Sequence, residues 1–131
     1  MKKILIVLGI CLISFFSFMG ISEAAWELSG TDQKLGPMWY DSGSIMTGKD
    51  PGTVCFKLRV NRPDKKAGHM INHILIDKSR MYAIIYWGEM TDGSGQVVVS
   101  QEQRIPLLIA DLTPAWKDVI VKVLQIYDNR R

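Results

Sequence analysis

The sequence predicts an α+β domain in which an antiparallel sheet of about six strands is covered on one face by a C-terminal helix. Three observations lead to this class. Turn signals separate short apolar runs over most of the chain, one of these runs alternates between apolar and polar residues, and a helical spacing of apolar residues begins after residue 113. A helix with one apolar face needs a surface to cover that face, so sheet and helix belong to one unit.

Turn residues divide the first part of the predicted domain into strands. The "DPGT" stretch at residues 50–53 favours a turn, because its proline presets one dihedral angle and its glycine tolerates a positive one. Two strands are predicted over residues 70–77 and 80–87, on either side of the polar "DKSR" turn. The "TDGSG" stretch predicts a hairpin before the strand "QVVVSQEQR".

The clearest strand is "TVCFKLRV", residues 53–60, in which apolar and polar residues alternate. This alternation predicts a half-buried strand. The predicted buried face carries Val54, Phe56, Leu58 and Val60, and the mostly polar face carries Cys55, Lys57 and Arg59.

The last element is predicted to be an amphipathic helix. Thr113 is expected to cap its free amides through the side chain, and Pro114 suits the first helical position. The apolar residues follow at the spacing of one helix face. They are Trp116, Val119, Ile120, Val123, Leu124 and Tyr127.

Residues 1–24 have the features of a signal peptide. A basic start at residues 2–3 precedes an almost wholly apolar run over residues 4–21. Small residues, Ser22 and Ala24, then occupy the −3 and −1 positions of a cleavage site after Ala24. The sequence therefore predicts an exported protein whose mature domain spans residues 25–131, in the periplasm, at the cell surface or secreted.

Three alternatives concern this leader. A cut after Ala25 would place Glu23 at −3, where small residues are preferred. An uncleaved anchor is compatible with the length, because about 18 apolar residues span roughly 27 Å. A lipoprotein is disfavoured, because bulky Ile10 precedes Cys11 and this cysteine lies early in the apolar run.

The charge of the predicted mature domain argues against nucleic-acid binding. Removing Lys2, Lys3 and Glu23 from the 16 basic and 13 acidic residues leaves 14 and 12, a net charge of +2. This excess is small, and no basic run supports it. Cys55 is the one cysteine left, so it implies a free thiol, an intermolecular bridge or a reducing habitat.

No catalytic, metal or cofactor motif stands out, so the domain is predicted to be non-enzymatic. In a strand, His69 and His73 would stand roughly 13 Å apart, too far to share one metal ion. Cys55 as a nucleophile would need a histidine base, and no local signature supports such a pair. The "GSG" at residues 93–95 lies in a predicted hairpin, which is not the context of a phosphate loop.

The stretch "WYDSGSI" reads as a turn and not as a catalytic site. Asp41 and the two serines have no histidine near them in the sequence, and both residue types favour turns through bonds to the nearby backbone. Gly43 permits the bend. Tyr40 and Ile45 are expected to anchor its two sides in the core.

Aromatic residues are the candidates for a binding surface. Such residues form protein-binding or ligand-binding surfaces, but they also serve as core and cross-strand packing. Both interpretations apply to Trp39, Tyr40, Tyr82, Tyr86 and Trp87.

A family resemblance rests on several short segments in a fixed order. The segments are "WELSGTD", "WYDSGSI", "VCFKL", "ILIDKSRMY" and "RIP", followed by the predicted helix. Together they resemble the surface-adhesin protein E-like family of small exported bacterial proteins, over nearly all of residues 26–124. By this resemblance Tyr40, Asp41, Ser44 and Ile45 match the family's turn, Lys57 its strand lysine, and Asp77, Arg80 and Tyr82 its later strand. The resemblance implies a sheet with a helix over its concave face, no catalytic residues, and adhesion to host proteins.

One departure from the family's pattern concerns a disulfide. The resemblance implies a cysteine after the "ID" pair and a second in the final helix, but Lys78 and either Val123 or Leu124 stand there. Closing a loop of about 45 residues would stabilise by roughly 4 kcal/mol in the chain-entropy model. Burying six large apolar helix residues gives a gross upper bound of about 9–18 kcal/mol. Packing can therefore hold the helix without the bridge.

Three functions follow as expectations. The first is an adhesin-like module that binds a host or envelope protein, with a homodimer as a further option. The second is a periplasmic carrier of an apolar or haem-like ligand, with Met70, Met81 and Met90 as contacts, which requires a cavity of several hundred Å³. The third is a thiol-dependent enzyme that uses Cys55. The sequence favours the first.

Overall fold

A computed structural model describes residues 24–130 of the chain. The basic start, the apolar run and Cys11 of the predicted leader lie outside the described residues. Within residues 24–130, no helix combines the length and the apolar content needed to cross a membrane.

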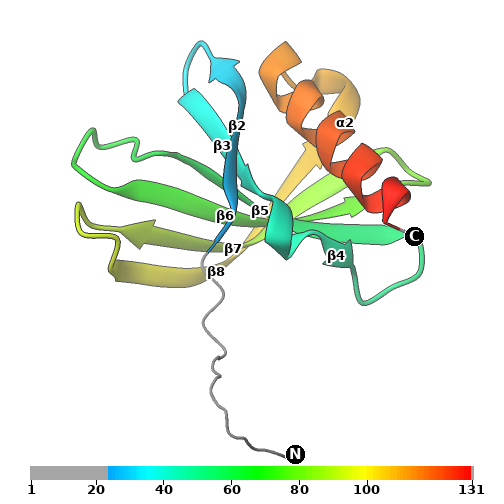
Figure 1. The fold of residues 1–131 in the computed structure, drawn as a ribbon, viewed down its shortest axis with the longest axis horizontal. Helices are drawn as coiled ribbons and strands as arrows, with labels where there is room; N and C mark the ends of the chain where they lie inside the picture. The colour runs from blue at the N-terminus through cyan, green and yellow to red at the C-terminus, as the bar shows by residue number, and fades with distance from the viewer. Residues whose placement is uncertain (1–23, 131) are drawn as a thin grey trace, which may run out of the picture.

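One antiparallel sheet and one helix make up most of the fold (Figure 1). The strands are β2 (Trp26–Asp32), β3 (Gly36–Asp41), β4 (Met46–Thr47), β5 (Thr53–Asn61), β6 (His69–Asp77), β7 (Tyr82–Thr91) and β8 (Val97–Leu108). Their order in the sheet is β2-β3-β5-β6-β7-β8, and β4 also pairs with β5. Two 3-10 turns, η1 (Ser42–Ser44) and η2 (Ile109–Asp111), and the helix α2 (Pro114–Asn129) complete the fold. The predicted α+β class is confirmed.

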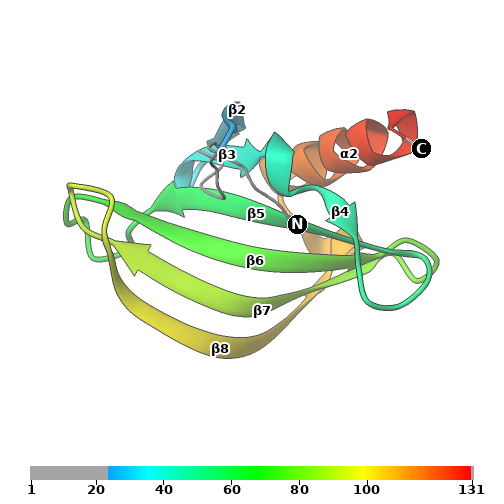
Figure 2. The same cartoon turned by 60° about the horizontal axis from the view of Figure 1, so that its bottom comes forward.

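The helix covers only the half of the sheet that begins the chain. It packs against β2, β3 and β5, and Figure 2 shows it on the same side of β5–β8 as β2 and β3. Its predicted apolar face is confirmed, since Val119, Ile120 and Val123 are buried in the core. Trp116, Leu124 and Tyr127 pack against that core while partly buried. Ala83 and Ile85 of β7 also belong to the buried core, whereas most of β8 is exposed.

The alternation predicted for β5 is confirmed. Val54, Phe56, Leu58 and Val60 are all buried, whereas Cys55, Lys57 and Arg59 are only partly buried. The cross-strand neighbours of the buried set in β6 include Ile74 and Ile76, which are also buried. The core therefore lies between this side of the sheet and α2.

Two strands differ from their predicted bounds by more than one residue. The strand expected over residues 80–87 runs from Tyr82 to Thr91, because Met81 adopts a left-handed φ of 49° and still belongs to the preceding turn. The last strand continues to Leu108, past the predicted "QVVVSQEQR" segment. It includes Pro106, which an edge strand tolerates because the missing N–H faces no neighbouring strand.

The turn predicted for "WYDSGSI" is confirmed, because Ser42–Ser44 form the 3-10 turn η1. Asp41 precedes η1, and its carboxylate accepts a hydrogen bond from the Gly43 nitrogen. Tyr40 and Ile45 are both buried in the core. β3 pairs with one end of β5 and β4 with the other, so the bend lets the chain leave β5 and return to it.

The predicted cap at Thr113 is wrong. Thr113 does precede α2, and Pro114 does occupy its first turn, but the threonine side chain makes no capping hydrogen bond. Its hydroxyl donates instead to the buried carboxylate of Asp32, at 2.6 Å. The Thr113 hydroxyl bonds the Asp32 carboxylate and not the helix amides, because hydrogen bonds to an ionised group are stronger than those between neutral groups.

Candidate functional site

The face of the sheet opposite α2 carries most of the predicted aromatic residues. We call it the outer face and define it by Trp39, Arg59, His73 and Trp87, which belong to β3, β5, β6 and β7. In the sheet register Trp39 lies beside Arg59, and His73 lies beside Trp87. These pairs define two neighbouring groups on one surface.

The five predicted aromatic residues do not form one patch. Tyr40 is buried in the core and cannot belong to an exposed surface. Trp39 lies on β3, while Tyr82, Tyr86 and Trp87 lie on β7, with β5 and β6 between them. Of these four, only Tyr86 is well exposed. The outer face is therefore a mixed aromatic and basic surface.

Arg59 is the cation of the first group. Its guanidinium carbon lies 4.9 Å from the ring centroid of Trp26 and 4.5 Å from that of Trp39. Such cation–π contacts stabilise a partly desolvated guanidinium. Its Nε atom is buried and has no hydrogen-bond partner among the described residues. Burial lowers the pKa of Arg59, and it also lowers the pKa of His69, whose ring meets Trp39 edge-on.

The second group joins β6 and β7. His73 Nε2 lies 3.2 Å from the carboxylate of Glu89, and its ring meets that of Tyr86 edge-on. His69 belongs to the first group, so the two histidines are not brought to one site. Within residues 24–130, no three His, Cys, Asp or Glu side chains are placed to hold a metal ion.

The surroundings of Cys55 do not resemble those of an activated thiol. Burial raises the pKa of the thiol, and the adjacent Tyr86 hydroxyl opposes this only in part. A nucleophilic cysteine needs the opposite shift and a nearby base. The polar side chain beside Cys55 is thus a tyrosine, and His73 is engaged with Glu89.

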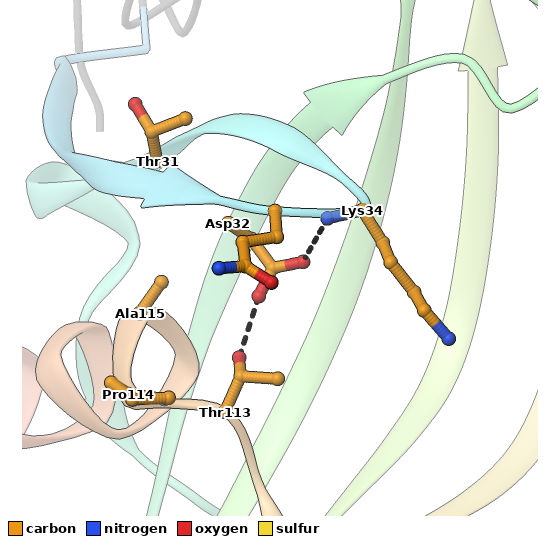
Figure 3. Close-up of a pocket in the computed structure, with 7 residues that line it drawn as sticks. Thr31, Asp32, Lys34, Thr113, Pro114 and Ala115 are labelled. Carbon is orange, nitrogen blue, oxygen red and sulfur yellow. Dashed lines mark hydrogen bonds between the residues drawn. The ribbon is translucent and has the colours of Figure 1, made fainter.

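A hollow of about 410 Å³ lies where the β2–β3 turn meets the start of α2 (Figure 3). Asp32 lies at its base, with Thr113 bonded to one carboxylate oxygen and the Lys34 and Leu35 nitrogens bonded to the other. The Thr113 hydrogen bond is the main reason why the pKa of Asp32 is lowered, followed by the Leu35 amide. Both carboxylate oxygens of Asp32 thus accept hydrogen bonds from this chain itself. The carboxylate joins the β2–β3 turn to the start of α2.

The other large hollows also lie at the surface. One of about 420 Å³ is lined by Arg80, Met81, Tyr82, Leu108 and Ala110, at the turn between β6 and β7. Met70 and Met90 are cross-strand neighbours elsewhere, beside a hollow of only about 40 Å³. The three methionines named as carrier contacts are therefore not brought together.

The open edge position of β8 is the feature that sequence reasoning did not find, although the strand itself was predicted. It pairs with β7 on one side and with nothing on the other side, in the part of the chain that the structure describes. Almost every residue along it is exposed, including large apolar ones. Residue exposures of 44–57% occur at Val97, Val98, Val99, Ile105 and Leu108. A run such as "QVVVS" reads as a core strand, and only the position at the sheet edge exposes it.

The opposite edge, β2, is covered. Lys122 of α2 reaches it, and its ammonium donates to the carbonyl oxygen of Ser29 at 2.7 Å and to the Ser29 hydroxyl at 3.3 Å. The pairing of β2 with β3 is also irregular between Leu28 and Gly30. Lysines, bulges and helices are the usual means of protecting an edge.

No protein-family model, no curated protein and no solved structure matches this chain. Its candidate functional regions are consequently defined by its own residues. They are the free edge of β8 and the outer face.

Proposed function

We propose that this chain is an exported, non-enzymatic protein-binding module that receives an extended segment of another protein along the free edge of β8. The exposed edge carries the proposal. β8 is a twelve-residue strand with one open side and five exposed apolar side chains. An unpaired edge offers backbone donors and acceptors to an incoming strand, while side-chain contacts select the sequence.

The chemistry of β8 defines the partner segment. Residues 97–99 are three valines and contain no charge, proline or glycine that would discourage pairing. Charge and proline follow only at Glu102, Arg104 and Pro106. The matching segment is therefore extended, rich in apolar residues and low in charge, at least opposite Val97–Val99.

The wider setting follows from the sequence. The predicted signal peptide supports export, and the resemblance to the protein E-like family supports an adhesin-like role at the cell surface or in the envelope. The partner is then a host or envelope protein. The outer face lies on the same sheet and can add contacts from Tyr86 and Trp87 beside the incoming segment.

The alternative of an apolar-ligand carrier has less support. Residues from the sheet and from α2, such as Met38, Leu58 and Val123, have no exposed surface where they meet. The described hollows of several hundred Å³ lie elsewhere, at surface turns. A ligand held between sheet and helix would need to displace this packing.

The test uses two matched variants. Val98→Lys adds one positive charge to the β8 edge, and Val121→Lys adds one positive charge to α2, where the valine is 51% exposed against 53% for Val98. Residues 25–131 of each are titrated against purified extracellular-matrix proteins and against purified proteins of the organism's own envelope. We expect saturable binding that the edge variant weakens at least tenfold, because a buried lysine beside a docked strand is unpaired.

Three results would contradict the proposal. The first is equal weakening by both variants, and the second is no saturable binding to any protein of either panel. The third is a concentration-dependent dimer of the purified chain that the edge variant abolishes. That result would replace partner binding by self-association through β8.

A further inference from the structure

Asp41 is a buried carboxylate without a cationic side chain to balance it. It is 5% exposed, and none of the ion pairs among residues 24–130 involves it. Its Oδ1 accepts hydrogen bonds from two backbone nitrogens, those of Gly43 and Ala25, both at 3.0 Å. Buried carboxylates are ordinarily paired or richly hydrogen-bonded. A positive charge at this position would therefore be stabilised.

The backbone nitrogen and the carbonyl oxygen of Ala25 are both hydrogen-bonded to the bend at residues 41–42. Its nitrogen donates to Asp41, and its carbonyl oxygen accepts from the Ser42 nitrogen at 3.1 Å and from the Ser42 hydroxyl at 3.4 Å. The next residue, Trp26, begins β2 and stands opposite Asp41 in the register with β3. The Ala25 nitrogen is thus fixed beside the carboxylate, and a change in its charge would act directly on Asp41.

The sequence independently predicts that this nitrogen changes its charge. The cleavage site after Ala24 makes Ala25 the first residue of the mature chain. We propose that this cleavage converts the Ala25 amide nitrogen into an α-ammonium that forms an ion pair with Asp41. The inference rests on the export step of the proposed function and is independent of β8.

The covalent step is a hydrolysis by a signal peptidase. Water adds across the Ala24–Ala25 peptide bond, and that C–N bond breaks. The carbonyl carbon of Ala24 gains the oxygen and becomes a carboxylate, while both protons of the water end on the Ala25 nitrogen as –NH₃⁺. No oxidation or further reactant is involved. One N–H of the ammonium donates to Asp41, and the other two can donate to solvent or to nearby oxygens.

The geometry distinguishes the two cleavage registers. A cut after Ala24 leaves the charged nitrogen at the atom that already donates to Asp41. A cut after Ala25 removes that donor and also the carbonyl that Ser42 bonds. A retained leader leaves a neutral amide against the carboxylate. Asp41 therefore favours the mature chain that begins at Ala25 over the other forms.

Other charged groups lie close to this bend. Arg130, beyond the end of α2, donates from its guanidinium to the Ser42 carbonyl oxygen at 3.0 Å. Glu27 on β2 lies 3.4 Å from the Tyr40 hydroxyl. The ion pair needs a protonated α-amine, so its stabilisation is present at pH 7 and is lost at a pH well above about 8, where a free α-amine titrates.

The test compares chains that differ only in their first residue. Chains beginning at Ser22, Ala25 and Trp26 all contain β2 to α2, which are the elements that form the sheet and core. At pH 7 we expect the Ala25 chain to melt about 4–8 °C above the Ser22 chain. In Asp41→Asn versions this difference should fall below about 2 °C. Arg130→Ala serves as a control and should leave the difference unchanged.

Several results would overturn the proposal. Equal melting temperatures for the Ser22 and Ala25 chains would do so, as would a difference that persists in Asp41→Asn. If Asp41→Asn does not fold, the difference in melting temperature between the Ala25 and Ser22 chains must still shrink between pH 7 and about pH 10. A constant difference would contradict the ion pair. Sequencing of the exported protein must also find Ala25 at the N-terminus. None of these readouts depends on binding at β8.

Discussion

The two edges of the sheet differ in how far the chain protects them. At β2 the helix packs alongside, Lys122 bonds the Ser29 carbonyl oxygen, and an irregularity interrupts the pairing with β3. At β8 the first five residues are three valines, a serine and a glutamine, all of them exposed. The same sheet thus has one covered edge and one bare edge.

This contrast carries functional information, because both edges face the same hazard of uncontrolled pairing. The chain covers β2 with a helix whose apolar face packs in or against the core. It leaves β8 long, apolar and unpaired within the described residues. A bare edge on an otherwise protected sheet is where a strand from a partner can be added. The predictions below break or sharpen this contrast, from the largest expected effect to the smallest.

The strongest way to break the contrast is to loosen α2 from β2. Ile120→Ala should lower the free energy of unfolding by about 2–5 kcal/mol, because Ile120 is fully enclosed in the core. Urea denaturation followed by circular dichroism measures the change. The matched control is Val121→Ala, whose side chain is exposed on the same helix and should cost less than about 0.5 kcal/mol. Similar losses for both variants would mean that α2 does not hold the core as described.

The second largest loss of stability is expected when the link between the β2–β3 turn and the start of α2 is removed. Asp32→Ala removes the acceptor of three hydrogen bonds and should cost about 2 kcal/mol at pH 7. The pKa of Asp32 is lowered in the folded chain, chiefly by Thr113. Its contribution is therefore present above the unfolded value of about 3.9 and is lost as the pH falls through the lower folded value. A difference between the two proteins that stays constant from pH 7 to pH 2 would contradict this assignment.

Much of the fold could be predicted because its signals are local. The alternation at Val54, Phe56, Leu58 and Val60 and the helical spacing from Trp116 to Tyr127 each reflect one element's own period. The bend at Asp41 was predictable for the same reason, since its side chain bonds a residue only two positions away. Local patterns thus defined the elements and the packed face of the helix.

The candidate sites were not predictable, because they depend on residues far apart in the chain. Thr113 bonds Asp32 across 81 positions, and Arg59 meets Trp26 only because β3 brings two other strands together. The valines of β8 look like core residues, and their exposure follows from the strand order. Tyr40 had two predictions, as a core anchor of the bend and as a candidate for the aromatic surface, and its burial confirms the first and excludes the second.

The smallest expected effect concerns the lysine at the covered edge. Lys122→Met keeps the aliphatic stem and removes the donor to Ser29, so it should cost about 0.5–1 kcal/mol. It should also raise self-association in sedimentation experiments, because the carbonyl at the β2 edge becomes free. Lys117→Met, exposed on the same helix, is the control and should change neither quantity. Equal behaviour of the two variants would mean that Lys122 does not guard β2.

The most direct measurement of the central claim is amide hydrogen exchange across the sheet, in the free chain and in its complex with the tightest-binding protein of the panels. In the free chain, we expect faster exchange in β8 than in β2, because β8 pairs on one side only and most of its residues are exposed. In the complex, β8 amides should gain strong protection while those of β2 and α2 stay as they were. Protection confined to the outer face or to α2, with β8 unchanged, would contradict the account.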